Sequence, residues 1–231
     1  MTRVILIGSG GRMGRFTQDL LAAAEDLELA AAIGRDADLA GVLADVRPDV
    51  GLDFTVAGQG ATHGRILLES GVRPVIGTSG VTPQEDAELD ALARERGLGG
   101  LVVPNFCLGV WLQQELARTA AQHLHSIEIV EEHHASKVDA PSGTAADTAV
   151  QLAAVRGVEP GDIPVHSVRL KGLYSNQTVL LGGPGEVMRL THEVYSNDAF
   201  GPGILASLRY AASAAPGIER GVGHAFRAAS R

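Results

Sequence analysis

The segment 129–145 gathers the most reactive side chains of the sequence. Its two adjacent histidines, His133 and His134, are followed closely by Lys137. Neighbouring residues of an extended chain point to opposite sides, so we expect one histidine to face a reacting carbon as an acid and the other to anchor a carboxylate. A metal centre is the obvious alternative, but adjacent histidines without a third spaced Cys, His or Asp lack the usual ligand geometry. The pattern therefore favours acid catalysis on a small anionic substrate.

A helix start follows these residues directly. Pro141 and Ser142 precede an Ala-rich run, which is typical of a helix N-terminus. The amides near Gly143 and Thr144 then have no intrahelical partners, so they can bind an anion. Ser142 is a poor hydrolytic nucleophile, because Pro-Ser-Gly-Thr is not the G-x-S-x-G turn of hydrolases. Any one of these residues alone would be explained by a polar loop and a capped helix, but together they predict a site for a small dicarboxylate.

A glycine-rich turn near the N-terminus predicts a dinucleotide site. Residues 8–14 read Gly-Ser-Gly-Gly-Arg-Met-Gly and lie between a short apolar strand and a helix. In that setting, backbone amides and the helix dipole face a pyrophosphate. The spacing is G-x-x-G-x-x-G, because Met13 stands at the third position of the usual G-x-G-x-x-G, and a tight turn without a ligand is the alternative. The residues expected to contact the cofactor here are Gly8, Ser9, Gly10, Gly11, Arg12 and Met13.

The residues after the second predicted strand indicate which dinucleotide binds. NAD sites usually carry an acid there to accept from the ribose 2′-hydroxyl, but this sequence has Gly34 followed by Arg35. With no acid to repel a 2′-phosphate, Arg12 and Arg35 can both pair with it. We therefore expect NADPH as the preferred cofactor and NADH as a second one that the site accepts. In the alternative, Arg35 is a solvated surface residue and Asp36 binds the ribose.

Three further segments follow predicted strands and are expected beside the cofactor. Ligands of open parallel sheets lie across the carboxyl ends of the strands. The small residues of 77–79 would let a nicotinamide ribose approach the backbone closely. Taken singly, each segment is more often only a loop. The expected contacts are Phe54, Gly77, Thr78, Ser79, Val103, Pro104, Asn105 and Phe106.

The first hundred residues alternate short apolar runs with longer segments of helical period, which predicts strand–helix units and a parallel sheet. Right-handed crossovers turn such units into a Rossmann-like, doubly wound α/β sheet. The helix after the glycine turn shows the period clearly, since Met13, Phe16, Leu20, Leu21 and Ala24 form one apolar face. The expected strands are Val4–Ile7, Leu29–Ile33, Val50–Phe54, Val72–Ile76 and Leu101–Val103.

From about Phe106 the pattern changes to that of a smaller α+β unit with an antiparallel or mixed sheet. Helices are expected from Trp111 to His123 and from Thr144 to Ala154, with a further helix through Leu205 to Ala214 near the C-terminus. The strands expected in this half are Ser126–Val130, Val165–Leu170, Thr178–Leu181, Val187–Thr191 and His192–Ser196.

Charge and composition exclude several classes of protein. There are 19 Lys and Arg against 27 Asp and Glu, so the net charge is −8, and no stretch concentrates enough positive charge to follow a nucleic-acid backbone. Cys107 has no second cysteine to pair with, which suits a reducing compartment. The apolar run Val4–Ile7 is too short for a signal peptide, and no later run approaches the roughly 20 residues of a membrane span. We expect a cytoplasmic protein that binds neither nucleic acid nor membrane.

These residues resemble those of one known family, 4-hydroxy-tetrahydrodipicolinate reductase, also called dihydrodipicolinate reductase, of bacterial lysine and diaminopimelate synthesis. The resemblance covers nearly the whole chain. The last matching segment is highly specific, whereas the first is shared by many dinucleotide enzymes. The matching segments are Gly10–Gly14, Asp53–Thr55, Gly77–Gly80, Pro104–Phe106 and Glu132–Ala145.

The resemblance implies a role for each residue of the most specific segment. His133 would be the proton donor or acceptor, and Lys137 would be a second proton donor. His134 would contact the substrate. Gly143 and Thr144 would bind a substrate carboxylate through a backbone amide and a hydroxyl. The implied reaction is the NAD(P)H-dependent reduction of 4-hydroxy-tetrahydrodipicolinate.

The resemblance also implies the organisation of the chain. Residues 1–105, completed by 202–231, would form the dinucleotide-binding domain, and residues 106–201 the substrate-binding and tetramerisation domain. Members of the family are homotetramers joined through the sheet of the second domain. Asn197 stands where the family commonly has an arginine. This departure leaves open a reductase or dehydrogenase of another small imino or amino acid, and a non-catalytic NADP-binding sensor is the third alternative.

Overall fold

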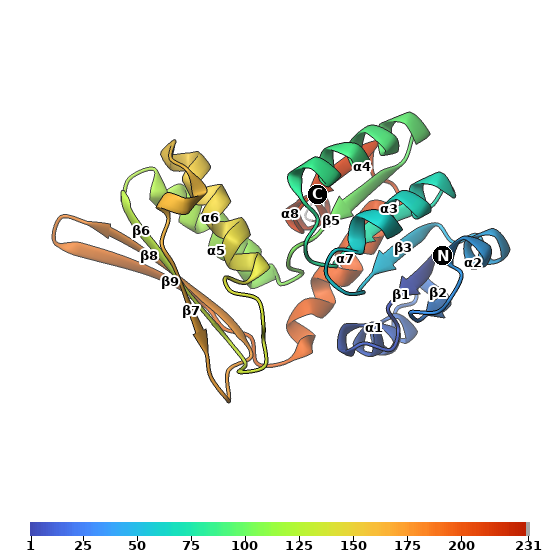
Figure 1. Ribbon diagram of the computed structural model, residues 1–231, viewed down its shortest axis with the longest axis horizontal. Coiled ribbons are helices and arrows are strands. Elements are labelled where there is room, and N and C mark those ends of the chain that lie inside the picture. Colours follow the sequence, from blue (N-terminus) through green and yellow to red (C-terminus); the bar gives the residue numbers. More distant parts are fainter. Residues whose placement is uncertain (230–231) are drawn as a thin grey trace. The chain divides into compact units, whose positions relative to one another are not determined.

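The chain folds into two compact units. The computed structural model describes residues 1–229. The first unit contains Met1–Phe106 and the chain from Phe200 onward, and the second contains Cys107–Ala199. The colours of Figure 1, from blue to red along the chain, show red helices and a blue strand in the same unit. The first unit is therefore built from both ends of the sequence.

A six-stranded parallel sheet forms the centre of the first unit. Its order is β10-β5-β4-β3-β1-β2, and every neighbouring pair is parallel. The order reverses between β1 and β3, because β2 lies on one side of β1 while β3 and β4 continue on the other. Ligands of doubly wound sheets bind outside the carboxyl ends of the strands at such a switch point. The strands are β1 (Thr2–Ile7), β2 (Leu27–Ile33), β3 (Val50–Asp53), β4 (Arg73–Ile76), β5 (Gly99–Val102) and β10 (Gly217–Arg220).

Helices cover both faces of this sheet. On one face, α2 (Leu39–Val46), α3 (Gly60–Glu69) and α4 (Pro83–Arg96) pack side by side. Right-handed crossovers place α1 (Arg12–Ala22) on the opposite face, where it packs with α7 (Gly201–Ala211), and α8 (Gly223–Ala229) lies against α7. Because the sheet is covered on both sides, its inner strands β3 and β5 are buried throughout, and the last four residues of β1 are all buried.

The ends of α4 show how local residue choice sets the limits of a helix. Thr82 accepts a hydrogen bond from the amide of Glu85, and the Glu85 carboxylate accepts one from the amide of Thr82 at 2.8 Å. Pro83 occupies the first turn, where its missing amide hydrogen costs nothing. Gly97 ends the helix with a φ of +68°, a conformation that glycine adopts without strain.

The second unit is a four-stranded sheet with both of its long helices on one face (Figure 1). The order is β7-β6-β8-β9, in which β7 is parallel to β6 and the other pairs are antiparallel. Buried Ile129, Val179 and Leu181 point from the sheet to Leu152 of the second helix. The elements are α5 (Leu108–Ala121), β6 (Ser126–His133), α6 (Gly143–Arg156), the 3₁₀ turn Pro160–Asp162, β7 (Val165–Arg169), β8 (Ser175–Gly183), β9 (Glu186–His192) and the 3₁₀ turn Asn197–Phe200.

The fold class predicted from the sequence is confirmed, and the second sheet takes the mixed form, one of the two forms expected for it. The second sheet is mixed because α6 crosses between β6 and β7, and a helical crossover joins parallel strands. The strand predicted at His192–Ser196 is wrong: β9 ends at His192, and the amide of Val194 donates to the Asn176 side chain at 3.0 Å instead of to a strand. The sequence also did not predict β10, which is too short to show a period.

Gln177 links the sheet of the second unit to both helices. Its Nε2 donates to Gln113 Oε1 at 2.9 Å and to Thr148 Oγ1 at 3.1 Å, and all three side chains are buried. Replacing Gln177 with leucine removes one hydrogen-bond partner from each of two buried side chains, so we expect the free energy of unfolding to fall by about 2–3 kcal/mol. Urea unfolding followed by circular dichroism measures this. Gln122→Leu, at the exposed end of α5, is the control, and equal stability of the two variants would contradict the expectation.

Candidate functional site

Close backbone contacts shape the glycine turn after β1. Gly8 has a φ of +90°, and a Cβ there would lie 2.5 Å from the carbonyl oxygen of Phe54, just past β3. A Cβ at Gly14 would overlap the carbonyl oxygen of Gly8. Glycine at both positions therefore lets α1 start at the switch point between β1 and β3. Gly10, by contrast, has open space where a side chain would be, which leaves room for a ligand.

Two side chains of α1 hold the carbonyl groups of this turn. Arg15 Nε and Nη2 donate to the carbonyl oxygen of Gly10 at 3.0 and 2.9 Å, and Gln18 Nε2 donates to that of Ser9 at 3.1 Å. Within residues 1–229, no side chain caps α1 at Gly11, so its first amides can bind an anion. The turn thus fits a pyrophosphate. Sequence reasoning missed Arg15 and Gln18, although each lies one helical turn after a glycine of the motif.

Arg35 lies beside this turn because the turn is bonded to the end of β2. The amides of Gly8 and Ser9 donate to the carbonyl oxygen of Ile33 at 2.9 and 3.0 Å. Gly34 follows with open space at its Cβ position, and Arg35 is exposed. Asp36, the alternative ribose ligand, is exposed as well. Arg12 is exposed at the first position of α1, so both arginines expected at a 2′-phosphate border the turn.

The segments after β3, β4 and β5 meet in an aromatic contact. Phe54 and Phe106 pack edge to face, with ring centroids 5.3 Å apart and an interplanar angle of 68°. A Cβ at Gly77 would lie 2.8 Å from the Phe106 ring and closer still to Phe54, so this contact requires glycine. The structure therefore brings these three sequence-predicted residues together. Ser79, Val103, Pro104 and Asn105 lie on the same segments.

Thr78 directs its side chain to a buried carboxylate. Asp53, at the end of β3, is fully buried, and its Oδ1 accepts from Thr78 Oγ1 at 2.9 Å and from the amide of Thr55 at 2.8 Å. His63 Nδ1 lies 3.1 Å from Oδ2 of the same carboxylate. The Thr78 side chain thus joins two strand ends, and the backbone is the part of this residue left for a cofactor.

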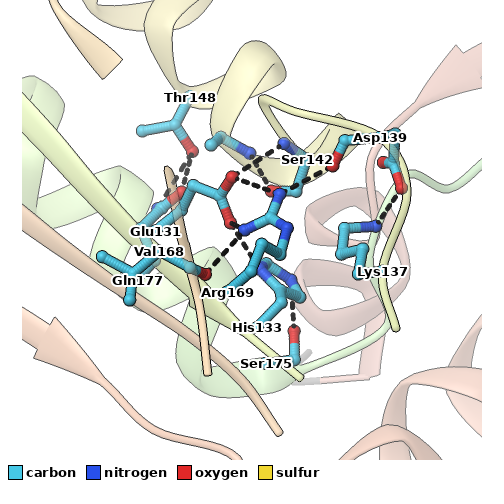
Figure 2. Close-up of polar contacts among 11 residues, drawn as sticks. Glu131, His133, Lys137, Asp139, Ser142, Thr148, Val168, Arg169, Ser175 and Gln177 are labelled. Carbon is cyan, nitrogen blue, oxygen red and sulfur yellow. Dashed lines mark hydrogen bonds and ion pairs between the residues drawn. The ribbon is translucent and has the colours of Figure 1, made fainter. Parts of the chain in front are cut away.

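In the second unit, a buried carboxylate holds His133 (Figure 2). His133 is the last residue of β6 and is 8% exposed, and Glu131, on the same face of the strand, is fully buried. His133 Nδ1 hydrogen-bonds to Glu131 Oε2, while His133 Nε2 lies 3.1 Å from Ser175 Oγ at the start of β8. The two ring nitrogens therefore have different partners, one a carboxylate and the other a hydroxyl.

Arg169 completes this cluster from β7. Its Nη2 and Nη1 donate to Oε1 and Oε2 of Glu131 at 2.8 and 2.9 Å. Further bonds run from Arg169 to the carbonyl oxygens of Val168 and Asp139, at 2.8 and 2.6 Å. The amide of Ser142, at the start of α6, donates to Glu131 Oε1 at 3.3 Å. Figure 2 shows His133, Arg169 and Ser142 converging on one carboxylate from two strands and a helix start.

Sequence reasoning missed Glu131 and Arg169 as site residues. Alternation along a strand places Glu131 and His133 on one face, which was the available signal for Glu131. Arg169 pairs with His133 across β6 and β7, far away in the sequence. The register of two such strands cannot be read from one sequence, so no comparable signal existed for Arg169.

Glu131 and His133 of this cluster have shifted pKa values. Burial raises the pKa of Glu131, but hydrogen bonds from Arg169, Ser167 and His133 outweigh it and hold that pKa at about 2. Burial lowers the pKa of His133; Glu131 opposes this shift, and the positive charges of Lys137 and Arg169 add to it. The imidazole is therefore mainly neutral near pH 7, and a bound anion would favour its protonated form.

Acid is expected to weaken the second unit through Glu131. Because its carboxyl pKa is depressed in the folded state, the stabilisation is complete above the ordinary pKa of 4.5 and is lost as the pH falls toward about 2. The melting temperature of the wild type should exceed that of Glu131→Gln by a constant amount above about pH 5, and the gap should close in acid. Glu128→Gln, at an exposed carboxylate of the same strand, is the control. A gap that widens in acid would contradict the shift.

Lys137 and His134 lie on the loop that follows β6. Lys137 Nζ pairs with Asp139 Oδ1 at 2.8 Å, and its side chain is 21% exposed. His134 Nδ1 lies 2.8 Å from Ser136 Oγ. The two adjacent histidines thus differ, since His133 is buried within the strand end and His134 lies outside it.

The predicted anion site at the start of α6 has an open first position. Ser142 is the N-cap, and its hydroxyl accepts from the amide of Ala145 at 3.2 Å. This cap does not use the amides of Gly143 and Thr144. Gly143 has open space where a Cβ would be, so a ligand carboxylate can approach its backbone.

Neither a metal-binding cluster nor a helix fit to span a membrane occurs among the described residues. Residues 1–229 hold no group of three or more His, Cys, Asp or Glu side chains arranged for a metal ion. None of the helices in that range has the length and apolar character that crossing a bilayer requires. Burial raises the pKa of Cys107 to about 12, so this thiol is not a nucleophile at neutral pH.

Known proteins match the chain over both units. The family model for the N-terminus of dihydrodipicolinate reductase matches residues 2–106, and the model for its C-terminus matches residues 109–221. A 4-hydroxy-tetrahydrodipicolinate reductase of Coxiella burnetii is 38% identical over 219 residues, covering 89% of this chain and 92% of the relative. One from Moorella thermoacetica is 37% identical over 244 residues, covering 90% and 91%. The structure of dipicolinate-bound dihydrodipicolinate reductase from Paenisporosarcina sp. TG-14 matches with a TM-score of 0.81 and 32% identity, covering 96% of this chain and 98% of that one.

Proposed function

Since this chain belongs to the dihydrodipicolinate reductase family, we propose that it reduces 4-hydroxy-tetrahydrodipicolinate with NADPH as its preferred cofactor. It is an oxidoreductase of lysine and diaminopimelate biosynthesis with an NAD(P)-binding N-terminal unit. The observation that carries the assignment of residues is the buried contact of His133 with Glu131 next to the start of α6. This contact links two groups: an imidazole that can transfer a proton, and a helix end that can bind an anion.

The substrate side of the proposal uses residues of the second unit. Gly143 and Thr144 hold one carboxylate through an amide and a hydroxyl, and His134 contacts the substrate. A ligand of this kind is supported by the solved relative, which is described as dipicolinate-bound. Lys137 and Arg169 add positive charge near the histidine, which favours a dianion.

The cofactor side uses residues of the first unit. The amides of the glycine turn and of the first turn of α1 hold the pyrophosphate, while Arg12 and Arg35 hold the 2′-phosphate. Phe54, Gly77 to Ser79 and Val103 to Phe106 line the nicotinamide end. When bound, NADPH supplies a hydride to C4 of the conjugated imine that forms as the substrate loses water. The open space at Gly10 and Gly34 supports the placement of the pyrophosphate and the 2′-phosphate beside the glycine turn.

The chain's own residues supply protons and stabilise charge. The substrate carboxylates favour the protonated form of His133, whose pKa is otherwise lowered by burial. His133 then gives a proton from Nε2, and Lys137 is the second donor. Their positive charges stabilise the electron density that the reduction pushes onto the imine nitrogen.

Replacing Arg35 with alanine should raise the KM for NADPH by about 10-fold, because a charge-assisted bond to the 2′-phosphate is lost. NADH lacks that phosphate, so its KM should not change. Steady-state kinetics with both cofactors measures the difference. Arg65→Ala, at an exposed arginine of the same unit, is the matched control. Equal losses for the two cofactors would mean that Arg35 does not recognise the phosphate.

Asn197 favours one alternative substrate class. The family commonly has an arginine there, whereas here Asn197 Oδ1 accepts a hydrogen bond from the Tyr174 hydroxyl. A neutral pair at this position suits a related imino acid with less negative charge. A panel of small cyclic imino acids, compared by kcat/KM under NADPH, tests this. The proposed function expects the highest value with 4-hydroxy-tetrahydrodipicolinate, and a higher value with another imino acid would favour the alternative.

We also propose a homotetramer joined through the four-stranded sheet. Both long helices cover one face of this sheet, and the opposite face carries exposed Val187 next to half-buried Val130 and Leu180. These three side chains are diagonal neighbours and share the face with Glu128, Thr178 and Arg189, so the uncovered face offers both apolar and polar groups to another chain. Light scattering on the purified protein should give four times the chain mass, and a monomer would contradict the proposal.

A further inference from the structure

We propose that Glu131 is a positioning residue of the reduction: its carboxylate decides which nitrogen of His133 carries the proton and ties this histidine to the start of α6. The inference rests on the proposed function, in which His133 moves a proton and Gly143 and Thr144 bind the substrate. It assigns to one buried carboxylate the alignment of both parts of the substrate site.

Besides the Ser167 side chain, four donor groups from three segments of the chain hydrogen-bond to Glu131. Its Oε1 accepts from Arg169 Nη2 at 2.8 Å and from the amide of Ser142 at 3.3 Å. Its Oε2 accepts from Arg169 Nη1 at 2.9 Å and from His133 Nδ1. An ionised carboxylate has only acceptor sites, so each of these four groups must bring its own hydrogen.

The tautomer of His133 follows from this arrangement. Because Oε2 of Glu131 cannot donate, Nδ1 must carry a hydrogen, whether the ring is neutral or protonated. In the neutral ring, Nε2 is therefore the unprotonated nitrogen, and it lies 3.1 Å from Ser175 Oγ. A proton enters and leaves only at Nε2, while the hydrogen on Nδ1 stays in its bond to Glu131. The imidazole thus exchanges protons with its surroundings at a single nitrogen atom, Nε2.

Arg169 keeps Glu131 ionised and in place. Its two parallel bonds fix the plane of the carboxylate, as a bidentate guanidinium does. Arg169 is held in turn by the carbonyl oxygens of Val168 and Asp139, on β7 and on the loop after β6. The carboxylate therefore cannot rotate to release His133 without breaking bonds to three segments of the chain.

The bond from Ser142 extends this control to the substrate anchor. Ser142 is the N-cap of α6, and the next two residues are the proposed carboxylate ligands. The same carboxylate oxygen pair thus sets the direction of His133 and the position of that helix start. A substrate held by α6 is consequently presented to an imidazole whose proton is already on the correct nitrogen.

The experiment compares Glu131→Gln with Glu128→Gln, which changes an exposed glutamate of the same strand that also pairs with a histidine, His166. A glutamine has one acceptor end and one donor end, so it cannot serve Arg169, Ser142 and His133 Nδ1 together. In ¹⁵N-histidine spectra, with the His133 signals assigned through their loss in His133→Gln, the wild type and Glu128→Gln should show hydrogen on Nδ1. Glu131→Gln should lose this preference, and its kcat should fall by about 100-fold or more, while the KM for NADPH stays within about 2-fold.

Each result decides the proposal separately from the proposed function. A neutral His133 ring in the wild type that carries its hydrogen on Nε2 and not on Nδ1 overturns it without any variant, even if Glu131→Gln does not fold. A folded Glu131→Gln that keeps both the Nδ1 hydrogen and its kcat overturns it as well. If the wild type does not oxidise NADPH with the substrate, the proposed function fails, whereas the spectra still test the role of Glu131.

Discussion

His133→Gln should lower kcat by about 10²- to 10⁴-fold and leave the substrate KM nearly unchanged, because general-acid catalysis contributes an effect of that size. Glutamine fills similar space and keeps a polar end near Ser175, so binding is little altered. It cannot take up and release a proton near neutral pH, so the loss falls on the transition state. Steady-state kinetics at saturating NADPH gives both constants.

The matched control for this variant is His166→Gln. His166 lies on β7, the strand next to β6, and pairs with Glu128 at an exposed position. Its replacement should leave kcat within about 2-fold, as is usual for surface changes away from a site. If His133→Gln instead raised KM and left kcat unchanged, His133 would be a binding residue and not the acid.

Lys137→Gln is expected to lower kcat/KM by about 10²- to 10³-fold, through both constants. The ammonium group attracts the dicarboxylate, so its loss raises the substrate KM. It is also the second proton donor, so its loss lowers kcat. Lys137 pairs with Asp139, whose side chain is 58% exposed, and this loose surface pair can be exchanged for a substrate carboxylate at little cost.

Lys171→Gln is the matched control, because it removes the same charge from an exposed position of the same unit. It should change kcat/KM by less than about 3-fold, since exposed charges are largely screened by salt. Equal effects of the two substitutions would show that only the overall charge of the unit matters. An effect of Lys137→Gln on the KM for NADPH alone would place the lysine at the cofactor instead.

The first unit was largely predictable because its signals are local. The turn 8–14, the apolar strand before it and the periodic helix after it lie next to one another in the sequence, and the structure has all three. For Phe54 and Phe106, the sequence predicted only that both lie at the same edge of the sheet, and not that their rings are in contact. Its requirement for glycine at Gly77 depends on the packing of two rings from distant segments, which no local pattern encodes.

In the second unit, the sequence predicted the local features but not the contacts between distant strands. The helix start at Ser142 was visible from proline, serine and the following alanines, and α6 begins at Gly143. The cluster around Glu131 was not visible, because it needs the register between β6 and β7 that sets Arg169 opposite His133. Two short strands can pair in several registers, and the tertiary structure selects one of them.

The reduction itself is tested most directly by an anaerobic assay in which dihydrodipicolinate synthase generates the unstable substrate in situ. We expect NADPH absorbance to fall only when both enzymes and the synthase substrates are present, with tetrahydrodipicolinate as the product by mass spectrometry. His133→Gln should remove nearly all of that rate. Tight NADPH binding by the wild type without oxidation in this assay would contradict the proposed reaction and favour a cofactor-binding sensor or a reductase of another imino acid.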